Sequence, residues 1–194
     1  SVDTEQIGVE CRGEDVARAM VRLREQYGLV REKIVIGLDR FDYTKGIPER
    51  LLAVDRFLTL YPEWHGRFVF VQAGVPSRSR IPAYRSVWRR IEGLVRRINR
   101  RHGVPGWAPV VLVPEQLSRT AIHALYRIAD CLMVTSLHDG MNLVAKEYAA
   151  ARTEGDGALV LSRFTGAARE FPEAFLVNPY NLDGIAERLA AALA

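Results

Sequence analysis

The sequence HDGMNLVAKE (residues 138–147) follows directly on the apolar run CLMVT (residues 131–135), and together they indicate the fold. The run has the composition of a buried strand, and the segment from Asn142 onward has the composition of a helix. A short polar turn with a carboxylate and a glycine separates the two. This order places backbone amides and the positive end of a helix at the carboxyl edge of a sheet, where open α/β folds bind anionic ligands. The stretch is typical of a nucleotide-binding site.

Strand and helix patterns alternate along the rest of the chain. Strands are predicted at Lys33–Leu38, Phe68–Ala73, Val110–Val113, Cys131–Thr135, Ala158–Leu161 and Phe175–Val177. Helices are predicted at 14–27, 48–61, 82–101, 118–127, 142–155 and 181–193, with Ser118 and Asn181 as N-caps. Strand–helix units joined by short loops predict an α/β fold, a parallel sheet with helices on both faces.

Length and composition indicate an ordinary globular domain. The 194 residues are 48% hydrophobic and 26% charged, enough for a sizeable core. No apolar run approaches the roughly 20 residues that span a membrane, and residues 1–5 lack the pattern of a signal peptide. Two cysteines make no disulfide framework. We therefore expect a cytoplasmic protein with no membrane partner.

The net charge of +4 has a local origin. Seven arginines crowd one predicted helix: Arg85, Arg89, Arg90, Arg96, Arg97, Arg100 and Arg101. A solvated helix face explains them better than a nucleic-acid interface, because no aromatic residues are interleaved with them and no nucleic-acid-binding motif accompanies them. We expect no nucleic-acid partner.

A second motif, GLDRFDYTKG (residues 37–46), lies at the end of the first predicted strand. Arg40 and Lys45 can neutralise a diphosphate there, Arg40 as a planar fork and Lys45 as a point charge. The alternative is that both cations pair with Asp39, Asp42 or Glu49 on the surface. The presence of the 138–147 turn at another strand end favours the binding site.

Within that turn, Gly140 permits close backbone approach and Asn142 starts a helix whose first amides lack intrahelical partners. Glu147 can accept hydrogen bonds from the vicinal hydroxyls of a ribose. The alternative for Glu147 is an exposed carboxylate that pairs with Lys146 or Arg152. For His138, a catalytic role and a solvent-facing structural role both remain open.

Several chemistries find no support in the sequence. It contains neither a Walker phosphate loop nor a G-x-G-x-x-G motif, which weighs against ATPases and dehydrogenases. The four histidines, His65, His102, His123 and His138, show no metal-ligand spacing, and no serine lies in a nucleophile elbow.

Four segments, in order, resemble the trehalose-6-phosphate synthases of retaining glycosyltransferase family 20. They are LDRFDYTKGIPERLLAVDRFL (38–58), HDGMNLVAKEYAAA (138–151), LVLSRFTGAARE (159–170) and LVNPYNLDGIAERL (176–189). The resemblance covers nearly all of residues 34–194 and is far more specific than a short motif. Residues 1–30 resemble the family poorly.

The resemblance implies the carboxyl-terminal, donor-binding, Rossmann-like half of a GT-B glycosyltransferase. The family transfers glucose from UDP-glucose to glucose 6-phosphate with retention, in trehalose biosynthesis, and needs neither a metal nor another cofactor. We expect residues 1–30 to form a lead-in segment with a helix, and residues 31–194 to form the nucleotide-sugar-binding domain. The amino-terminal acceptor domain is missing from this chain, so we expect it to be a partner, and the chain alone to be almost inactive. The oligomeric state is left open, a homo-oligomer included.

Site roles follow residue by residue from the same resemblance. Arg40 and Lys45 would bind the donor diphosphate and stabilise its departure, and Asp139 would hold glucose hydroxyls. The remaining donor contacts would come from Gly140, Met141, Asn142, Leu143, Val144 and Glu147, the last through the ribose. Arg78 would reach the phosphate of the acceptor.

Two other readings remain. The chain is also compatible with a sister transferase that uses ADP- or GDP-glucose, or another acceptor such as glycerol 3-phosphate, and with a non-catalytic sugar-nucleotide-binding module. The sequence does not identify the base, because base contacts in this fold come largely from loop backbone, here around residues 115–117.

Overall fold

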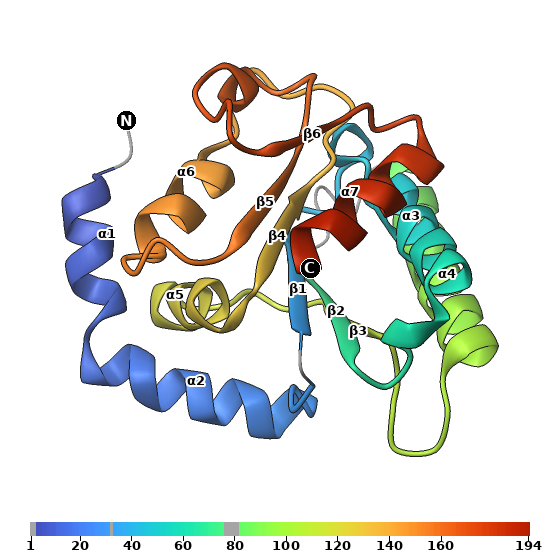
Figure 1. Cartoon of the computed structure of the whole chain (residues 1–194), viewed down its shortest axis with the longest axis horizontal. Helices are drawn as coiled ribbons and strands as arrows, with labels where there is room; N and C mark the ends of the chain where they lie inside the picture. Colours follow the sequence, from blue (N-terminus) through green and yellow to red (C-terminus); the bar gives the residue numbers. More distant parts are fainter. Residues whose placement is uncertain (1–2, 32, 76–81) are drawn as a thin grey trace.

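The computed structural model describes residues 3–31, 33–75 and 82–194, which form one layered α/β unit (Figure 1). The strands are β1 (Lys33–Leu38), β2 (Phe68–Ala73), β3 (Val110–Val113), β4 (Cys131–Val134), β5 (Ala158–Ser162) and β6 (Phe175–Val177). The α-helices are α1 (Thr4–Cys11), α2 (Glu14–Tyr27), α3 (Ile47–Leu60), α4 (Pro82–His102), α5 (Arg119–Ile128), α6 (Leu143–Ala151) and α7 (Leu182–Leu193). Short 3-10 helices are η1 (Tyr43–Lys45), η2 (Pro62–Trp64) and η3 (Gly166–Arg169).

The strands form one parallel sheet in the order β3-β2-β1-β4-β5-β6. Helices α1, α2, α5 and α6 cover one face, and α3, α4 and α7 cover the other (Figure 1). In β1, Ile34 and Ile36 belong to the first core and Val35 to the second. Burial on both faces explains why the strands are continuous apolar runs.

The chain reverses its direction across the sheet between β1 and β4. It runs from β1 outward to β2 and β3, and then returns to place β4 on the other side of β1. The loops that follow β1 and β4 therefore start at neighbouring strand ends, where the strand order reverses and open α/β sheets bind ligands. The amide of Leu137 donates to the carbonyl oxygen of Thr44 (2.8 Å), so the two loops lie side by side.

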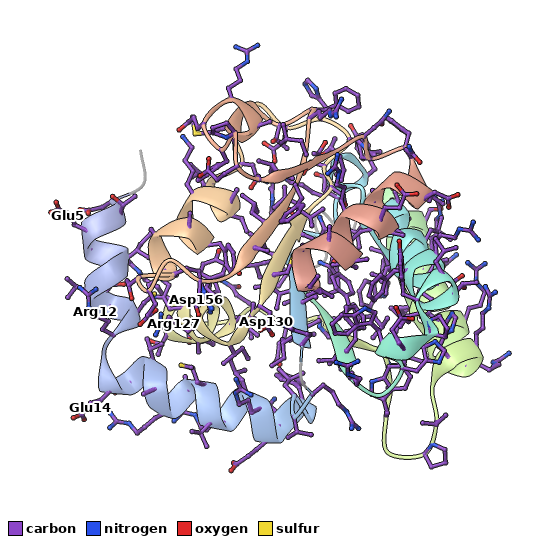
Figure 2. All side chains as sticks on the ribbon, in the orientation of Figure 1. Glu5, Arg12, Glu14, Arg127, Asp130 and Asp156 are labelled. Atoms are coloured by element: carbon purple, nitrogen blue, oxygen red, sulfur yellow. The ribbon has the colours of Figure 1, made fainter. Side chains whose placement is uncertain are left out.

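The amino-terminal segment contains one helix more than the sequence predicted. Helix α1 begins after Asp3, whose carboxylate accepts from the amide of Gln6 (3.0 Å). Ile7 in α1 and Leu23 in α2 are buried in the same core as β1. Charged side chains such as Glu5 in α1 and Glu14 in α2 point outward from these helices (Figure 2). The hydrophobic periodicity of α1 is weak and its length short, so the pattern did not reveal it.

Helix α6 ends at Ala151, earlier than the predicted Gly155. The amide of Arg152 still bonds to the carbonyl oxygen of Tyr148 (3.2 Å), but the backbone then turns through Gly155 and Gly157, both with positive φ. The helix therefore has Arg152 as its C-cap, three residues before Gly155.

Helix α4 carries the arginine-rich segment. Its apolar side, which includes Ile91 and Ile98, packs in the second core, while Arg89 and Arg96 are exposed. Within the described ranges, no helix is both long and apolar enough to cross a bilayer. The arrangement agrees with a solvated helix face.

Candidate functional site

The loop after β1 presents one cation to solvent and ties down another. Arg40 is exposed, and in the described part of the chain no hydrogen bond or ion pair holds its guanidinium. Nζ of Lys45 lies 2.7 Å from Oδ2 of Asp139, and the two side chains are 19% and 14% exposed. This pair joins the loop after β1 to the loop after β4.

The alternative pairing of these cations within their own loop is wrong. Asp42 instead caps η1, accepting from the amide of Thr44 (3.0 Å). Glu49 lies 3.7 Å from Arg90 on α4, and Asp39 pairs with Arg50. The loop carboxylates thus have other partners.

A wholly buried polar cluster lies beneath this loop; we call Arg50, Asp39, Gln72 and Thr135 the Arg50 cluster. The guanidinium of Arg50 donates to Oδ2 of Asp39 (2.8 Å), Oε1 of Gln72 (3.0 Å) and Oγ1 of Thr135 (3.0 Å). Thr135 in turn donates to the carbonyl oxygen of Gly46 (3.2 Å). A buried charge is tolerated only when its hydrogen bonds are satisfied. The acceptors of Arg50 lie on β2 and at the ends of β1 and β4, so the cluster connects these strands to α3.

Gly46 closes the loop where it meets the end of β4. Its φ is +62°, and a Cβ there would lie 2.2 Å from the carbonyl oxygen of Thr135. Both the conformation and the space require glycine. The backbone then enters α3 with Pro48 in the first turn, as the sequence predicted.

The carboxylate of Asp139 receives three donors from the protein. Besides Lys45, these are the side-chain amide of Asn142 (3.1 Å to Oδ2) and the backbone amide of Met141 (3.3 Å to Oδ1). Partial burial acts to raise the pKa of Asp139, but the hydrogen bonds from Lys45 and Asn142 outweigh it and leave the pKa below its usual value. Asp139 is therefore a fixed negative charge beside Lys45.

Asn142 is the N-cap of α6. It adopts φ +65°, and its side-chain oxygen accepts from the amide of Ala145 (2.9 Å). The amides of Leu143 and Val144 precede the first intrahelical bond, and no described residue accepts from them. Two unpaired amides and the positive end of α6 thus face the same strand ends as Arg40.

Gly140 packs against Gly166 through its carbonyl oxygen and is open on the side where a side chain would stand. A Cβ on Gly166 would lie 2.1 Å from the carbonyl oxygen of Gly140, whereas one on Gly140 would meet nothing within 4 Å. The turn is held against η3 by the amide of Gly166, which donates to the carbonyl oxygen of Asp139 (3.0 Å).

Glu147 is half-buried rather than fully exposed, and its partner is Tyr126. The hydroxyl of Tyr126 donates to Oε2 of Glu147 (2.9 Å). The partners proposed in the alternative, Lys146 and Arg152, pair with Glu170 (2.7 Å) and Asp156 (2.7 Å) respectively. The alternative for Glu147 is therefore wrong.

Two adjoining hollows open at this edge of the sheet. The Arg40 hollow, about 250 Å³, is lined by Leu38, Asp39, Arg40, Gly74, Val75, Glu115, Gln116, Leu117, Ile122 and Val144. The Glu147 hollow, about 440 Å³, is lined by Asp3, Ile7, Arg119, Ile122, His123, Leu143 and Glu147. Ile122 lines both hollows. Residues 115–117, the segment expected to contact a base, share the first hollow with Arg40.

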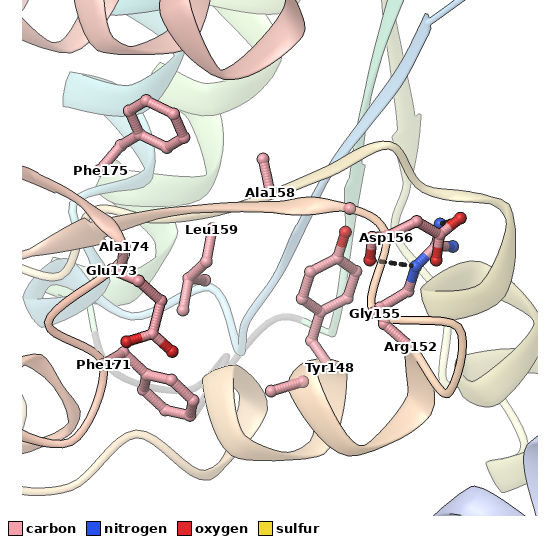
Figure 3. A pocket seen from close by; sticks show the side chains of 12 residues that line it. Tyr148, Arg152, Gly155, Asp156, Ala158, Leu159, Phe171, Glu173, Ala174 and Phe175 are labelled. Carbon is pink, nitrogen blue, oxygen red and sulfur yellow. Dashed lines mark hydrogen bonds and ion pairs between the residues drawn. The ribbon is translucent and has the colours of Figure 1, made fainter.

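Another cavity of about 320 Å³ lies at the opposite end of β5, next to Ala158 (Figure 3). Its lining includes Arg152 and Asp156, which are bonded to each other, and no residue predicted for the site. The strand ends beside Arg40 therefore remain the candidate site.

The comparisons with known proteins agree with this geometry. The model of glycosyltransferase family 20 matches residues 1–194. The chain belongs to glycosyltransferase family 20. The match includes residues 1–30, whose resemblance to the family is poor by motif.

The relatives of this family 20 chain are longer than it is. A trehalose-6-phosphate synthase from Mycobacterium leprae is 42% identical over 193 residues, 100% of this chain and 39% of the relative. A bifunctional trehalose-6-phosphate synthase/phosphatase from Thermoproteus tenax is 45% identical over 178 residues, 92% of this chain and 24% of the relative. The chain thus spans well under half the length of these relatives.

Solved structures of trehalose-phosphate synthases have the same fold as this chain over its whole length. An alpha,alpha-trehalose-phosphate synthase (UDP-forming) from Burkholderia xenovorans, in complex with glucose-6-phosphate, has a TM-score of 0.94 at 37% identity and covers 100% of this chain and 42% of that chain. An E. coli structure bound with UDP-2-fluoro glucose has a TM-score of 0.90 at 36% identity, with coverage of 100% and 42%. The predicted fold class, a Rossmann-like sheet of the GT-B type, is confirmed.

The family 20 chain brings nine of its ten predicted site residues to one edge of the sheet. The tenth, Arg78, lies outside the described residues. Within the described ranges, no group of three or more histidine, cysteine, aspartate or glutamate side chains is arranged to hold a metal.

Sequence reasoning missed Arg50 and Tyr126. A signal existed for Arg50, because it stands between Ile47 and Val54 on the apolar side of a predicted helix, where a charge is rare. Tyr126 gave no signal, because its hydroxyl reaches Glu147 only through the packing of α5 against α6.

Proposed function

We propose that this chain is the donor-binding part of a trehalose-6-phosphate synthase that transfers glucose from UDP-glucose to glucose 6-phosphate with retention. The observation that carries the proposal is the meeting of Arg40, Lys45 and the unpaired amides of α6 at one switch point. Relatives described as UDP-forming support uridine as the base.

The donor would lie across the two hollows. The base would occupy the Arg40 hollow beside residues 115–117, and the ribose hydroxyls would bond to Glu147 at the start of the second hollow. The diphosphate, which follows the ribose, would lie on the glucose side of it, against Arg40, Lys45 and the amides of Leu143 and Val144.

The charges of Arg40, Lys45 and Asp139 would favour the departure of a nucleoside diphosphate. When the glycosidic bond to phosphate breaks, negative charge develops on the diphosphate and positive character on the glucose ring. Arg40 and the two donors of Lys45 that Asp139 does not use would stabilise the leaving group. Asp139, fixed by three donors, would offer its negative charge to the glucose side of the site.

Binding of the acceptor sugar would need residues beyond those of the donor site. Arg78 would bind the phosphate of glucose 6-phosphate, and an amino-terminal acceptor domain would supply further contacts. A bound glucose-6-phosphate in the B. xenovorans relative supports this acceptor. Neither a metal nor another cofactor enters the proposed reaction.

Calorimetric titration of the chain with UDP, GDP and ADP tests the donor assignment. We expect UDP to bind most tightly and Arg40→Ala to weaken UDP about tenfold or more, because a charge-assisted contact to the diphosphate is lost. The matched control is Arg89→Ala, an exposed arginine on α4, which should leave the affinity unchanged.

Tighter binding of GDP or ADP would replace UDP-glucose by another nucleotide sugar. Binding of no nucleotide, or equal losses in Arg40→Ala and Arg89→Ala, would contradict the placement of the diphosphate at Arg40.

A further inference from the structure

Glu147 is held by a single buried hydroxyl. Tyr126 on α5 is wholly buried, and its hydroxyl donates to Oε2 of Glu147 (2.9 Å). In the part of the chain that the structure describes, no donor reaches Oε1 of Glu147. One carboxylate oxygen is therefore engaged by the protein, and Glu147 lines the Glu147 hollow.

Two cations near Glu147 pair with other carboxylates. Lys146, the adjacent residue, turns to Glu170 (2.7 Å). Arg119, which lines the same hollow, pairs through Nε with Glu10 (2.8 Å). The orientation of Glu147 thus depends on Tyr126 rather than on an ion pair.

From this geometry we infer that Tyr126 is a positioning residue for the donor, acting through Glu147 on the ribose hydroxyls. The inference rests on the proposed function, since it takes the ligand of Glu147 to be a nucleoside diphosphate. A carboxylate fixed through one oxygen presents the other to a hydroxyl pair without losing side-chain freedom on binding, so binding is stronger.

The tyrosine is suited to act only as a donor. Burial and the nearby Glu147 carboxylate raise the pKa of Tyr126 well above its usual value, so the hydroxyl keeps its proton at physiological pH. The ring is fixed by an edge-on contact with Tyr148, whose centroid lies 6.0 Å away. The hydroxyl therefore has one fixed direction, toward Glu147.

Tyr126→Phe removes this hydroxyl and keeps the ring. The test compares binding of UDP and 2′,3′-dideoxy-UDP to the 194-residue chain, which isolates the contribution of the ribose hydroxyls. We expect Tyr126→Phe to reduce the preference for UDP over the dideoxy analogue about five- to tenfold, a part of the value of one hydrogen bond to a charged group. Affinity for the dideoxy analogue should stay the same.

Tyr148→Phe is the matched control. It removes another buried tyrosine hydroxyl from the same ring pair, but that hydroxyl donates to the carbonyl oxygen of Ala129 (3.2 Å). We expect it to lower thermal stability as Tyr126→Phe does, and to leave the preference for UDP unchanged.

The outcomes separate the inference from the proposed function. An unchanged preference in Tyr126→Phe, with tight UDP binding, would overturn the inference alone. Equal reductions in both tyrosine variants would do so too, because they would show a merely structural effect. Failure of the unmodified chain to bind UDP would overturn the proposed function and the inference with it.

Discussion

Arg40 and Arg50 lie on either side of the same loop, and their surroundings are opposite. Arg40 is exposed, and no described residue bonds to its guanidinium. Arg50 is wholly buried and donates to Asp39, Gln72 and Thr135. A buried cation must have its donors satisfied, whereas an exposed one can keep them for a ligand. The comparison separates the cation that holds the loop from the cation that the loop presents.

The largest expected effect tests the structural side of this comparison. Arg50→Met should lower the free energy of unfolding by about 3–5 kcal/mol, because Asp39 is left as a buried charge without its partner. Arg40→Met, a matched change at an exposed position, should alter it by less than about 0.5 kcal/mol. Urea unfolding followed by circular dichroism measures both values.

Adding Asp39→Asn to Arg50→Met should restore part of the lost stability, since the unpaired charge is then removed. Equal stability of the two single variants would show that the Arg50 cluster does not hold the loop.

Lys45 and Asp139 are intermediate between the two arginines. Their side chains are partly buried, and Lys45 keeps hydrogen-bond donors that Asp139 does not use. The pKa of Asp139 is lowered in the folded chain, so its charge stabilises the fold above the usual pKa of about 4. That contribution is lost as the pH falls through the lowered value. Stability should therefore fall more steeply in acid for the unmodified chain than for Asp139→Asn.

Urea unfolding at a series of pH values between about 2 and 6 measures the two slopes. Parallel curves would mean that Lys45 and Asn142 do not hold the carboxylate in solution as they do in the structure.

The smallest effect is expected at the exposed arginines of α4. Replacing Arg89, Arg96 and Arg100 together by glutamine should leave UDP affinity unchanged and alter stability by less than about 0.5 kcal/mol. These residues resemble Arg40 in exposure but lie away from the strand ends. A loss of affinity like that of Arg40→Ala would show that overall positive charge, not position, attracts the nucleotide.

Local patterns in the sequence were enough for most elements of the fold. Every predicted strand is present, and Ser118 and Asn181 cap their helices through hydrogen bonds to the amides of Ala121 (3.2 Å) and Gly184 (3.0 Å). Apolar runs and caps depend on neighbouring residues alone, so they can be read without the tertiary structure. The failures, helix α1 and the end of α6, are places where this local signal is weak.

The sequence by itself also determined which strand ends carry cations, carboxylates and free amides, since parallel strands bring their carboxyl ends to one edge. Only the tertiary structure decided which of these groups meet. Lys45 reaches Asp139 because β4 returns to the side of β1, and Tyr126 reaches Glu147 because α5 packs against α6. Such partners lie far apart in the chain, and packing, not periodicity, selects them.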